Sequence, residues 1–301
     1  MRQIFLTIAP DFLLILLGGA VRSRLTPEGW RGIDRLNFEV LFPALLFVAA
    51  SSRPIAMSEL AGLGLLVWGL LFLGFGLGWL IRPLGPERFI DFAGSWQVAW
   101  RFNTALGFVC AASLPETARA LMPVAIGMGV PLANLLAVSA LSRGGGLGLA
   151  ATVKRVALNP FLLATLAGLA VGLSGVALPQ VPLHAVERVA QAGIPVALIS
   201  VGAMLDWGAL VKPSAFTLAM NAIKLVVLPA VALGVVLLFG LDPARGAVLI
   251  LFAALPTAAA SHVLASVFGA DPRGASTLVA QTTIYSVVTL PVWIAVAQGL
   301  F

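Results

Sequence analysis

The feature of this sequence that most constrains its fold is a series of apolar runs, each close to the length that crosses a bilayer. A spanning helix needs roughly 20 consecutive, mostly apolar residues. Ten such runs lie at residues 4–21, 36–52, 59–81, 90–112, 120–141, 156–178, 189–205, 214–239, 246–268 and 275–299. Only 10% of the residues are charged, whereas soluble domains usually carry about 25%. The sequence therefore predicts an all-α, multi-pass membrane protein with ten transmembrane helices.

The basic residues predict the orientation of these helices. Of the 18 Lys and Arg residues, eleven lie in connections after odd-numbered runs, five lie on the other side, and Arg101 and Lys224 fall inside runs. Cytoplasmic loops are enriched in Lys and Arg, so both termini are expected outside the cytoplasm. The basic residues occur singly or in pairs, which indicates topology signals and no nucleic-acid partner. The first run is expected to be a retained helix and not a cleaved signal peptide.

The two halves of the chain resemble each other in order. APDFLLILLGG from Ala9 corresponds to NPFLLATLAGL from Asn159, and the prolines Pro43 and Pro195 occupy matching runs. FNTA in the fourth run corresponds to LPTA in the ninth. A repeat with an odd number of helices enters the membrane in the opposite orientation, as in many secondary transporters. We therefore expect two inverted five-helix repeats, at residues 1–150 and 151–301.

Polar residues interrupt the fourth run in the stretch WRFNTALGF, residues 100–108. A charged side chain is costly in lipid, so Arg101 is expected to face the protein interior, a water-filled cavity or the interface. Asn103 and Thr104 add hydrogen-bonding groups, and Gly107 weakens the helix. Together they favour a helix break that lines a cavity. An exposed helix N-terminus at such a break attracts an anion.

The ninth run carries a second polar group, in LPTAAASH from Leu255. Pro256 lacks a backbone donor and kinks a helix, and Thr257, Ser261 and His262 follow it. His262 titrates near neutral pH, and both a coupling-proton role and a packing role remain open.

Other polar and sulfur-containing residues carry weaker signals. Lys224 is expected to extend its amine to the membrane interface. Asn159 either caps the sixth helix or faces the binding site. A single cysteine, Cys110, excludes an internal disulfide, and no Cys/His cluster has zinc-site spacing. No cofactor is expected apart from a coupling proton or sodium ion.

Several longer motifs resemble the auxin efflux carrier family, in particular its bacterial members, within the bile-acid, arsenite and riboflavin transporter superfamily. They are LNFEVLFPALLF (36–47), FNTALGF (102–108), NPFLLATLAGL (159–169), IPVALISVGAML (194–205), ALPTAAASHVLASVFGAD (254–271) and TTIYSVVTLPVW (282–293). The resemblance implies that helices 4 and 9 are broken and cross at the midplane. It places the substrate beside Asn103 and Thr104, with Asn159 and Pro160 near the pocket. It also implies an inner-membrane location, a homodimer, and dicarboxylate or auxin-like substrates.

The leading hypothesis is a secondary active transporter that moves a small organic anion, such as malate, malonate or an auxin-like acid, by alternating access. Arg101, Asn103, Thr104, Asn159, Pro256, Thr257 and Ser261 are the expected substrate-binding residues, and His262 is the expected proton carrier. One alternative is a sodium-coupled symporter of the bile-acid type. An intramembrane serine hydrolase using Ser200 or Ser261 with His262 is disfavoured, because no G-x-S-x-G elbow is present. A passive membrane scaffold would not need polar groups at this depth.

Overall fold

The structure of the protein is a computed structural model that describes residues 2–51, 57–111, 113–119, 121–145, 150–151, 154, 157–176, 178–204 and 213–301. Its regular elements are helices, and no strand occurs within these ranges. The first half contains α1 (Arg2–Val21), η1 (Arg22–Arg24), α2 (Pro27–Leu36), η2 (Asn37–Leu41), α3 (Phe42–Ser51), α4 (Met57–Leu80), η3 (Arg82–Leu84), α5 (Phe89–Trp96), η4 (Gln97–Ala99), α6 (Thr104–Ala111), α7 (Glu116–Arg119) and α8 (Met122–Gly144). The second half contains α10 (Pro160–Ser174), α11 (Gln180–Met204), α13 (Ala215–Ala222), η5 (Ile223–Val227), α14 (Leu228–Phe239), α15 (Pro243–Ala254), α16 (Ala260–Val267) and α17 (Pro272–Gln298).

The helices of the described residues confirm the all-α class and include long apolar segments typical of a multi-pass membrane protein. Among the described residues, the stretches Gly62–Leu80, Glu116–Gly144, Ala215–Phe239 and Pro272–Gln298 are long and apolar enough to cross a membrane. The predicted runs 90–112 and 246–268 each divide into shorter helices, because an irregular segment interrupts them.

Prolines and indole groups shape the long helices locally. Pro229 has no N–H, so the carbonyl of Leu225 loses its usual partner one turn later in the helix. The indole N–H of Trp293 donates to this carbonyl at 2.9 Å. The turn before Pro229 is the π-helical segment η5, in which Leu228 N bonds to Ile223 O. The segment η2 precedes Pro43 in the same way, so each π turn accompanies a proline.

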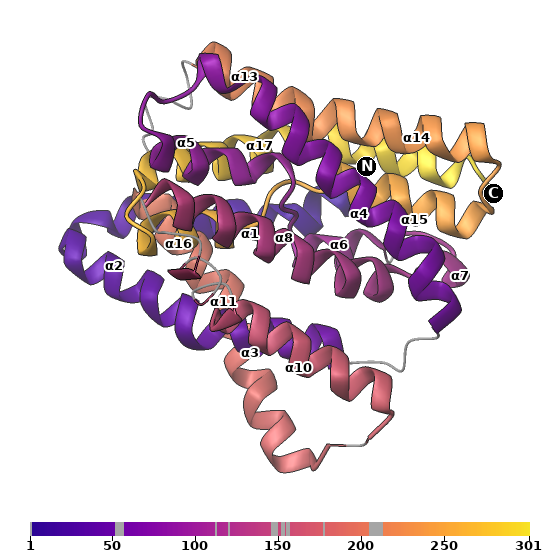
Figure 1. Cartoon of the computed structure of the whole chain (residues 1–301), viewed down its shortest axis with the longest axis horizontal. Coiled ribbons are helices and arrows are strands. Elements are labelled where there is room, and N and C mark those ends of the chain that lie inside the picture. Colours follow the sequence, from indigo (N-terminus) through magenta and orange to yellow (C-terminus); the bar gives the residue numbers. More distant parts are fainter. Residues whose placement is uncertain are drawn as a thin grey trace.

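The helices pack as two bundles. We call α1, α2, η2, α3, α10 and α11 the small bundle, because α1 packs on α11 and α3 packs on α10 and α11. We call α4–α8 and α13–α17 with their short helical turns the large bundle, in which α4 packs on α8 and α15 packs on α14 and α17. In Figure 1, α3, α10 and α11 lie in the lower part of the view, and α13, α14 and α17 lie in the upper part.

The close contact between α1 and α11 in the small bundle depends on two glycines. A Cβ atom added to Gly18 on α1 would collide with the carbonyl of Ile199, and one added to Gly202 on α11 would collide with the carbonyl of Ile15. Small residues let helix backbones approach closely, as is common between membrane helices. Each helix therefore presents a glycine to the backbone of the other.

Candidate anion site at two broken helices

Two irregular segments interrupt the helices at the centre of the large bundle. Residues 100–103 separate η4 from α6, and residues 255–259 separate α15 from α16. Both breaks were expected from the sequence, the first from its polar residues and the second from Pro256. The backbone groups freed by a break need other partners when they are buried.

The two irregular segments form hydrogen bonds with each other directly. The backbone N–H of Asn103 donates to the carbonyl of Pro256 at 2.8 Å. The side-chain amide of Gln97 donates to the carbonyl of Ser261 at 2.9 Å and to that of Gly94 at 3.0 Å. Two interrupted helices from opposite halves of the chain therefore touch at their irregular segments.

Asn103 also caps the helix that follows the first break. Its side-chain oxygen accepts from the backbone N–H of Leu106 at 3.1 Å, and its carbonyl accepts from Gly107 N at 3.0 Å. Asparagine is among the best N-cap residues, because its side chain satisfies an otherwise unpaired N–H of the first turn. The single oxygen of the Asn103 side chain is therefore already engaged in holding α6.

A cavity of about 50 Å³ lies where both breaks meet the small bundle. A site of this size admits a few water molecules. Phe42, Leu45 and Leu46 line it from α3, and Ile194 lines it from α11. The remaining lining residues come from the large bundle and are Arg101, Phe102, Asn103, Thr104, Val130, Ala133, Asn134, Ala258, Ala259 and Ala260. The cavity thus lies on the boundary between the two bundles.

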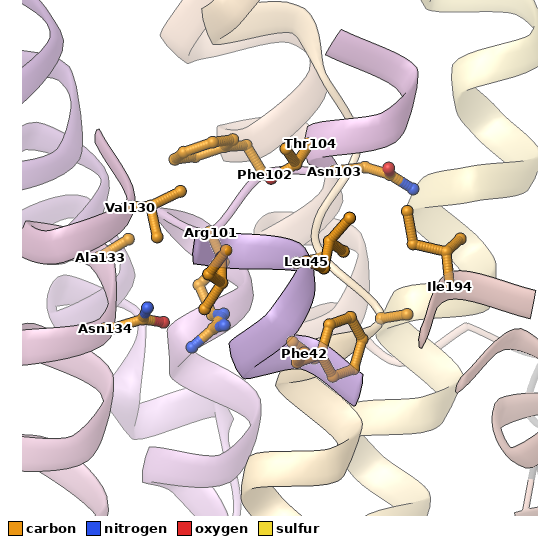
Figure 2. A pocket seen from close by; sticks show the side chains of 14 residues that line it. Phe42, Leu45, Arg101, Phe102, Asn103, Thr104, Val130, Ala133, Asn134 and Ile194 are labelled. Carbon is orange, nitrogen blue, oxygen red and sulfur yellow. The ribbon is translucent and has the colours of Figure 1, made fainter. Parts of the chain in front are cut away.

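Unpaired hydrogen-bond donors give this cavity its chemical character. Arg101 is only 5% exposed, and its Nε and Nη1 atoms have no hydrogen-bond partner within the described part of the chain. The side-chain nitrogen of Asn134, also buried, lacks one too. In Figure 2 the guanidinium group of Arg101 points into the space between Asn134 and Phe42. No Asp or Glu is among the residues that line the cavity. A buried cation with unused donors is costly alone and is suited to an acceptor such as a carboxylate.

The structure brings some of the expected site residues together and separates others. Arg101, Asn103 and Thr104 line the cavity, as the sequence analysis expected of residues beside a break. Pro256, Thr257 and Ser261 are not among its lining residues.

The remaining expected residues have other surroundings. Thr257 and Ser261 are fully buried, with their hydroxyl oxygens 3.4 Å apart. Asn159 is buried and lines a separate pocket of about 390 Å³, together with Phe38, Val267 and Phe268. That pocket also lies between the two bundles, where the start of α10 approaches the end of α16.

His262 has an acidic partner that the sequence analysis did not identify. Its Nε2 lies 3.2 Å from a carboxylate oxygen of Asp34, and both side chains are fully buried. The other carboxylate oxygen accepts a hydrogen bond from the hydroxyl of Ser200 at 2.5 Å. Asp34 belongs to α2 and Ser200 to α11, whereas His262 belongs to α16. The Asp34–His262 contact therefore joins the small bundle to the large bundle.

The surroundings of His262 determine where its protons lie. Its Nδ1 is 3.4 Å from the carbonyl oxygen of Pro272, which can only accept, so this contact favours a hydrogen on Nδ1. In a neutral ring the Nε2 atom would then be a bare acceptor facing the Asp34 carboxylate. The contact is attractive only when one further proton is present, either on the ring or on the carboxyl group. Asp34 and His262 thus form a buried pair of titratable side chains whose geometry suits the binding of a proton.

The same geometry does not form a hydrolytic triad. In a triad the histidine lies between the serine and the acid, whereas here the Ser200 hydroxyl donates to Asp34. The other candidate nucleophile, Ser261, has its hydroxyl oxygen next to that of Thr257. Within the described residues no group of three or more His, Cys, Asp and Glu side chains could hold a metal ion.

The side chain of Lys224 does not lie where the sequence predicted. It is only 2% exposed, and its amine donates to the carbonyl of Ala253 at 3.4 Å. The expectation that this amine reaches the interface is wrong, because Lys224 lies about 14 Å along the helix from Ala215, at 1.5 Å per residue. It also belongs to the face of η5 that packs against α15 and α17.

Comparisons with known proteins agree with the sequence motifs. Residues 148–294 match the family model described as "Membrane transport protein", that of the auxin efflux carrier family. A relative from Rhizobium meliloti (strain 1021), described as "Putative malonate transporter", is 28% identical over 312 residues, which cover 96% of this chain and 94% of the relative. The resemblance to this family is confirmed, and the family is one of transporters and not of enzymes.

Proposed function

We propose that this chain, which carries the membrane transport domain of the auxin efflux carrier family, is a secondary active transporter for small organic anions. The observation that carries the proposal is the set of unpaired donors on Arg101 and Asn134 in one buried cavity. A carboxylate there would accept from the guanidinium group and from the amide nitrogen. Short dicarboxylates such as malonate are the first candidates, since a distant relative is described as a malonate transporter.

The proposed membrane architecture has ten spanning helices in two inverted repeats, residues 1–150 and 151–301. The packing of the small bundle supports this proposal. Its first helix, α1, packs on α11, and α10 packs on α3. If the second repeat is the first one turned over, α1 corresponds to α10 and α3 to α11, so these two contacts are equivalent. The two breaks also fall in corresponding helices, which would cross near the midplane of the bilayer.

The position of the cavity between the two bundles supports a mechanism of alternating access. A displacement of one bundle against the other would open the cavity to one side of the inner membrane and close it to the other. The Asp34–His262 contact crosses the same boundary. Loss of its proton would leave a buried carboxylate facing a bare ring nitrogen, and this would favour separation of the bundles. We propose that this proton couples transport to the proton gradient.

Uptake into proteoliposomes tests the proposal. Radiolabelled malonate, malate, acetate and an indole carboxylate are compared, each with a proton gradient and with sodium or choline as the external cation. We expect uptake of at least one dicarboxylate, driven by the proton gradient and unaffected by replacing sodium with choline. Uptake that requires sodium would support the bile-acid type of symporter instead.

The matched variants are Arg101→Gln and Arg88→Gln, which each remove one cation. Loss of a hydrogen bond to a charged group costs about 1.5–3 kcal/mol, so Arg101→Gln should weaken substrate binding at least tenfold. Arg88 is exposed and lies at the start of α5, away from the cavity, so its variant should bind normally. If the correctly folded Arg101→Gln variant binds the substrate as tightly as the unmodified protein, the substrate does not bind at the assigned site.

A further inference from the structure

A second, larger cavity lies on the other face of α8 and is distinct from the Arg101 site. This groove has a volume of about 710 Å³ and is formed where the C-terminal ends of α4 and α8 meet α5. Aromatic rings form much of its wall, including Trp79, Phe89 and Trp96. Arg82 and Arg143 contribute its charged groups, and Ser139 contributes a hydroxyl. Arg82 lies just after α4 and Arg143 in the last turn of α8, and the connections that follow both helices are predicted to face the cytoplasm.

Aromatic side chains hold the first of these arginines in place. The guanidinium carbon of Arg82 lies 5.2 Å from the ring centres of Trp79 and Phe89. Such cation–π contacts restrain a cation without neutralising its charge. The neighbouring acid, Asp91, is already engaged, because it pairs with Arg88 at 3.6 Å and accepts from Asp271 N at 2.8 Å. The aromatic rings therefore hold the Arg82 guanidinium group in place without supplying a negative charge to pair with it.

The second arginine also lacks an acidic partner. Arg143 lies in the last turn of α8, and the sequence contains no Asp or Glu between Glu116 and Glu187. No ion pair of Arg82 or Arg143 occurs among the residues that the structure describes, and no acid lines the groove. The groove thus presents two uncompensated positive charges at one end of the membrane-spanning helices.

An open, apolar face of α4 extends from this charged end. Gly76 lines the groove, and an added Cβ atom would meet nothing within 4 Å there or at Gly69. These two glycines are seven residues apart, so they lie on one face of the helix, about 10 Å from each other. The side chain of Phe72, between them in the sequence, is 52% exposed. This surface offers an acyl chain an open, apolar path that begins at the two arginines.

We infer that the groove binds an anionic glycerophospholipid. The phosphate lies between Arg82 and Arg143, and one acyl chain follows α4 across Gly76 and Gly69. Basic pockets between membrane helices on the cytoplasmic side suit such headgroups. The inference depends on the chain spanning a membrane and not on the identity of the transported anion.

Native mass spectrometry of the purified, delipidated protein tests this inference. Phosphatidylglycerol and phosphatidylethanolamine with identical acyl chains are added at equal concentrations, and inorganic phosphate is tested separately by thermal shift. We expect phosphatidylglycerol to bind at least fivefold more than phosphatidylethanolamine, and inorganic phosphate to give no shift at millimolar concentration. Equal binding of the two lipids would overturn the inference. Stabilisation by inorganic phosphate equal to that by phosphatidylglycerol would also overturn it, because the site would then recognise free phosphate.

Two pairs of variants separate charge from shape. The double variant Arg82→Gln, Arg143→Gln should lose the preference for phosphatidylglycerol, whereas Arg22→Gln, Arg24→Gln removes two exposed arginines on the same predicted side and should keep it. Gly76→Leu should block the acyl path and reduce binding of phosphatidylglycerol at least threefold. Gly234→Leu, also in open space on a helix surface, should not. An unchanged thermal unfolding curve shows that the Arg82, Arg143 double variant is folded. If this folded variant binds the lipids as the unmodified protein does, the inference is contradicted.

Discussion

The carboxylate of Asp34 and the Nε2 atom of His262 lie 3.2 Å apart between the two bundles, and neither side chain reaches solvent. With a hydrogen on Nδ1 directed to the Pro272 carbonyl, this contact requires a bound proton to be attractive. Ser200 holds the carboxylate from α11, and Ser266, one turn beyond His262, also faces it. The proton state of one buried pair therefore bears on how tightly the bundles associate.

Replacing Asp34 by Asn should remove the coupling proton while preserving the shape of the side chain. A neutral His262 ring can accept from the Asn amide, so the variant needs no proton on the pair. We expect its uptake to lose dependence on the proton gradient. Measurements of initial uptake rate between pH 5.5 and 8.5, with and without a gradient, check this. A pH profile identical to that of the unmodified protein would show that the pair carries no coupling proton.

The same pair predicts how thermal stability responds to pH. Raising the pH removes the proton and leaves an uncompensated carboxylate in a buried site, so the melting temperature should fall as pH rises. Breaking a buried pair by losing one charge costs about 3–5 kcal/mol. Thermal unfolding of detergent-solubilised protein across this pH range measures the effect, and Asp34→Asn serves as the control with a flatter profile.

Arg101→Met should improve the stability of the ligand-free protein and abolish its function. The guanidinium group is buried with two unpaired nitrogen atoms, and an apolar side chain of similar length avoids that desolvation cost. We expect a higher melting temperature without ligand, no further rise on adding malonate, and at least tenfold slower uptake. Thermal shift with and without malonate separates these effects. A lower melting temperature of the ligand-free variant would mean that Arg101 is satisfied in a way that supports the fold.

The sequence was sufficient to locate the two helix breaks, because their causes are local. Pro256 lacks a donor, and Arg101 and Asn103 are polar groups that a lipid-facing helix would not carry. Hydropathy also identified the membrane-spanning character of the chain. The start of α2 was missed, although Thr26 caps it by accepting from Gly29 N at 3.2 Å and Pro27 occupies its first turn. This capping pattern is readable in the sequence, but the segment is too polar to stand out by hydropathy.

The partners across the bundles were not predictable by the same means. Asp34 precedes the predicted run 36–52 and meets His262 only because α2 packs against α16. The one available signal was the spacing of Trp30, Asp34 and Phe38, which places the acid on a buried helical face. Asn134 was not among the expected site residues, and only its position in the same cavity as Arg101 makes it a candidate ligand. Long-range packing, which a single sequence does not display, decides both.

The glycine contact between α1 and α11 should tolerate almost no enlargement. In Gly202→Ala the new Cβ atom would overlap the carbonyl of Ile15, which belongs to the helix backbone and cannot move aside alone. Overpacking of this kind costs about 1–3 kcal/mol or more. Gly69→Ala is the matched control, since its Cβ atom meets nothing within 4 Å. Thermal unfolding should show a clear loss for Gly202→Ala and no loss for Gly69→Ala; equal melting temperatures would mean that the two helices are not in contact.

Substitutions of Asn103 can separate its capping role from the character of the anion cavity. Asn103→Asp keeps an oxygen that caps α6 but adds a negative charge to the cavity wall, which would repel a carboxylate. Asn103→Ser keeps the cap without the charge, and Asn103→Ala loses the cap at a cost of about 1 kcal/mol. We expect the Asp and Ser variants to be more stable than the Ala variant. Anion uptake should fall most in the Asp variant, by at least tenfold, although that variant folds well. The opposite outcome is that uptake changes in parallel with stability across the three variants and that the Asp variant is fully active. In that case Asn103 only holds the helix, and the anion binds elsewhere.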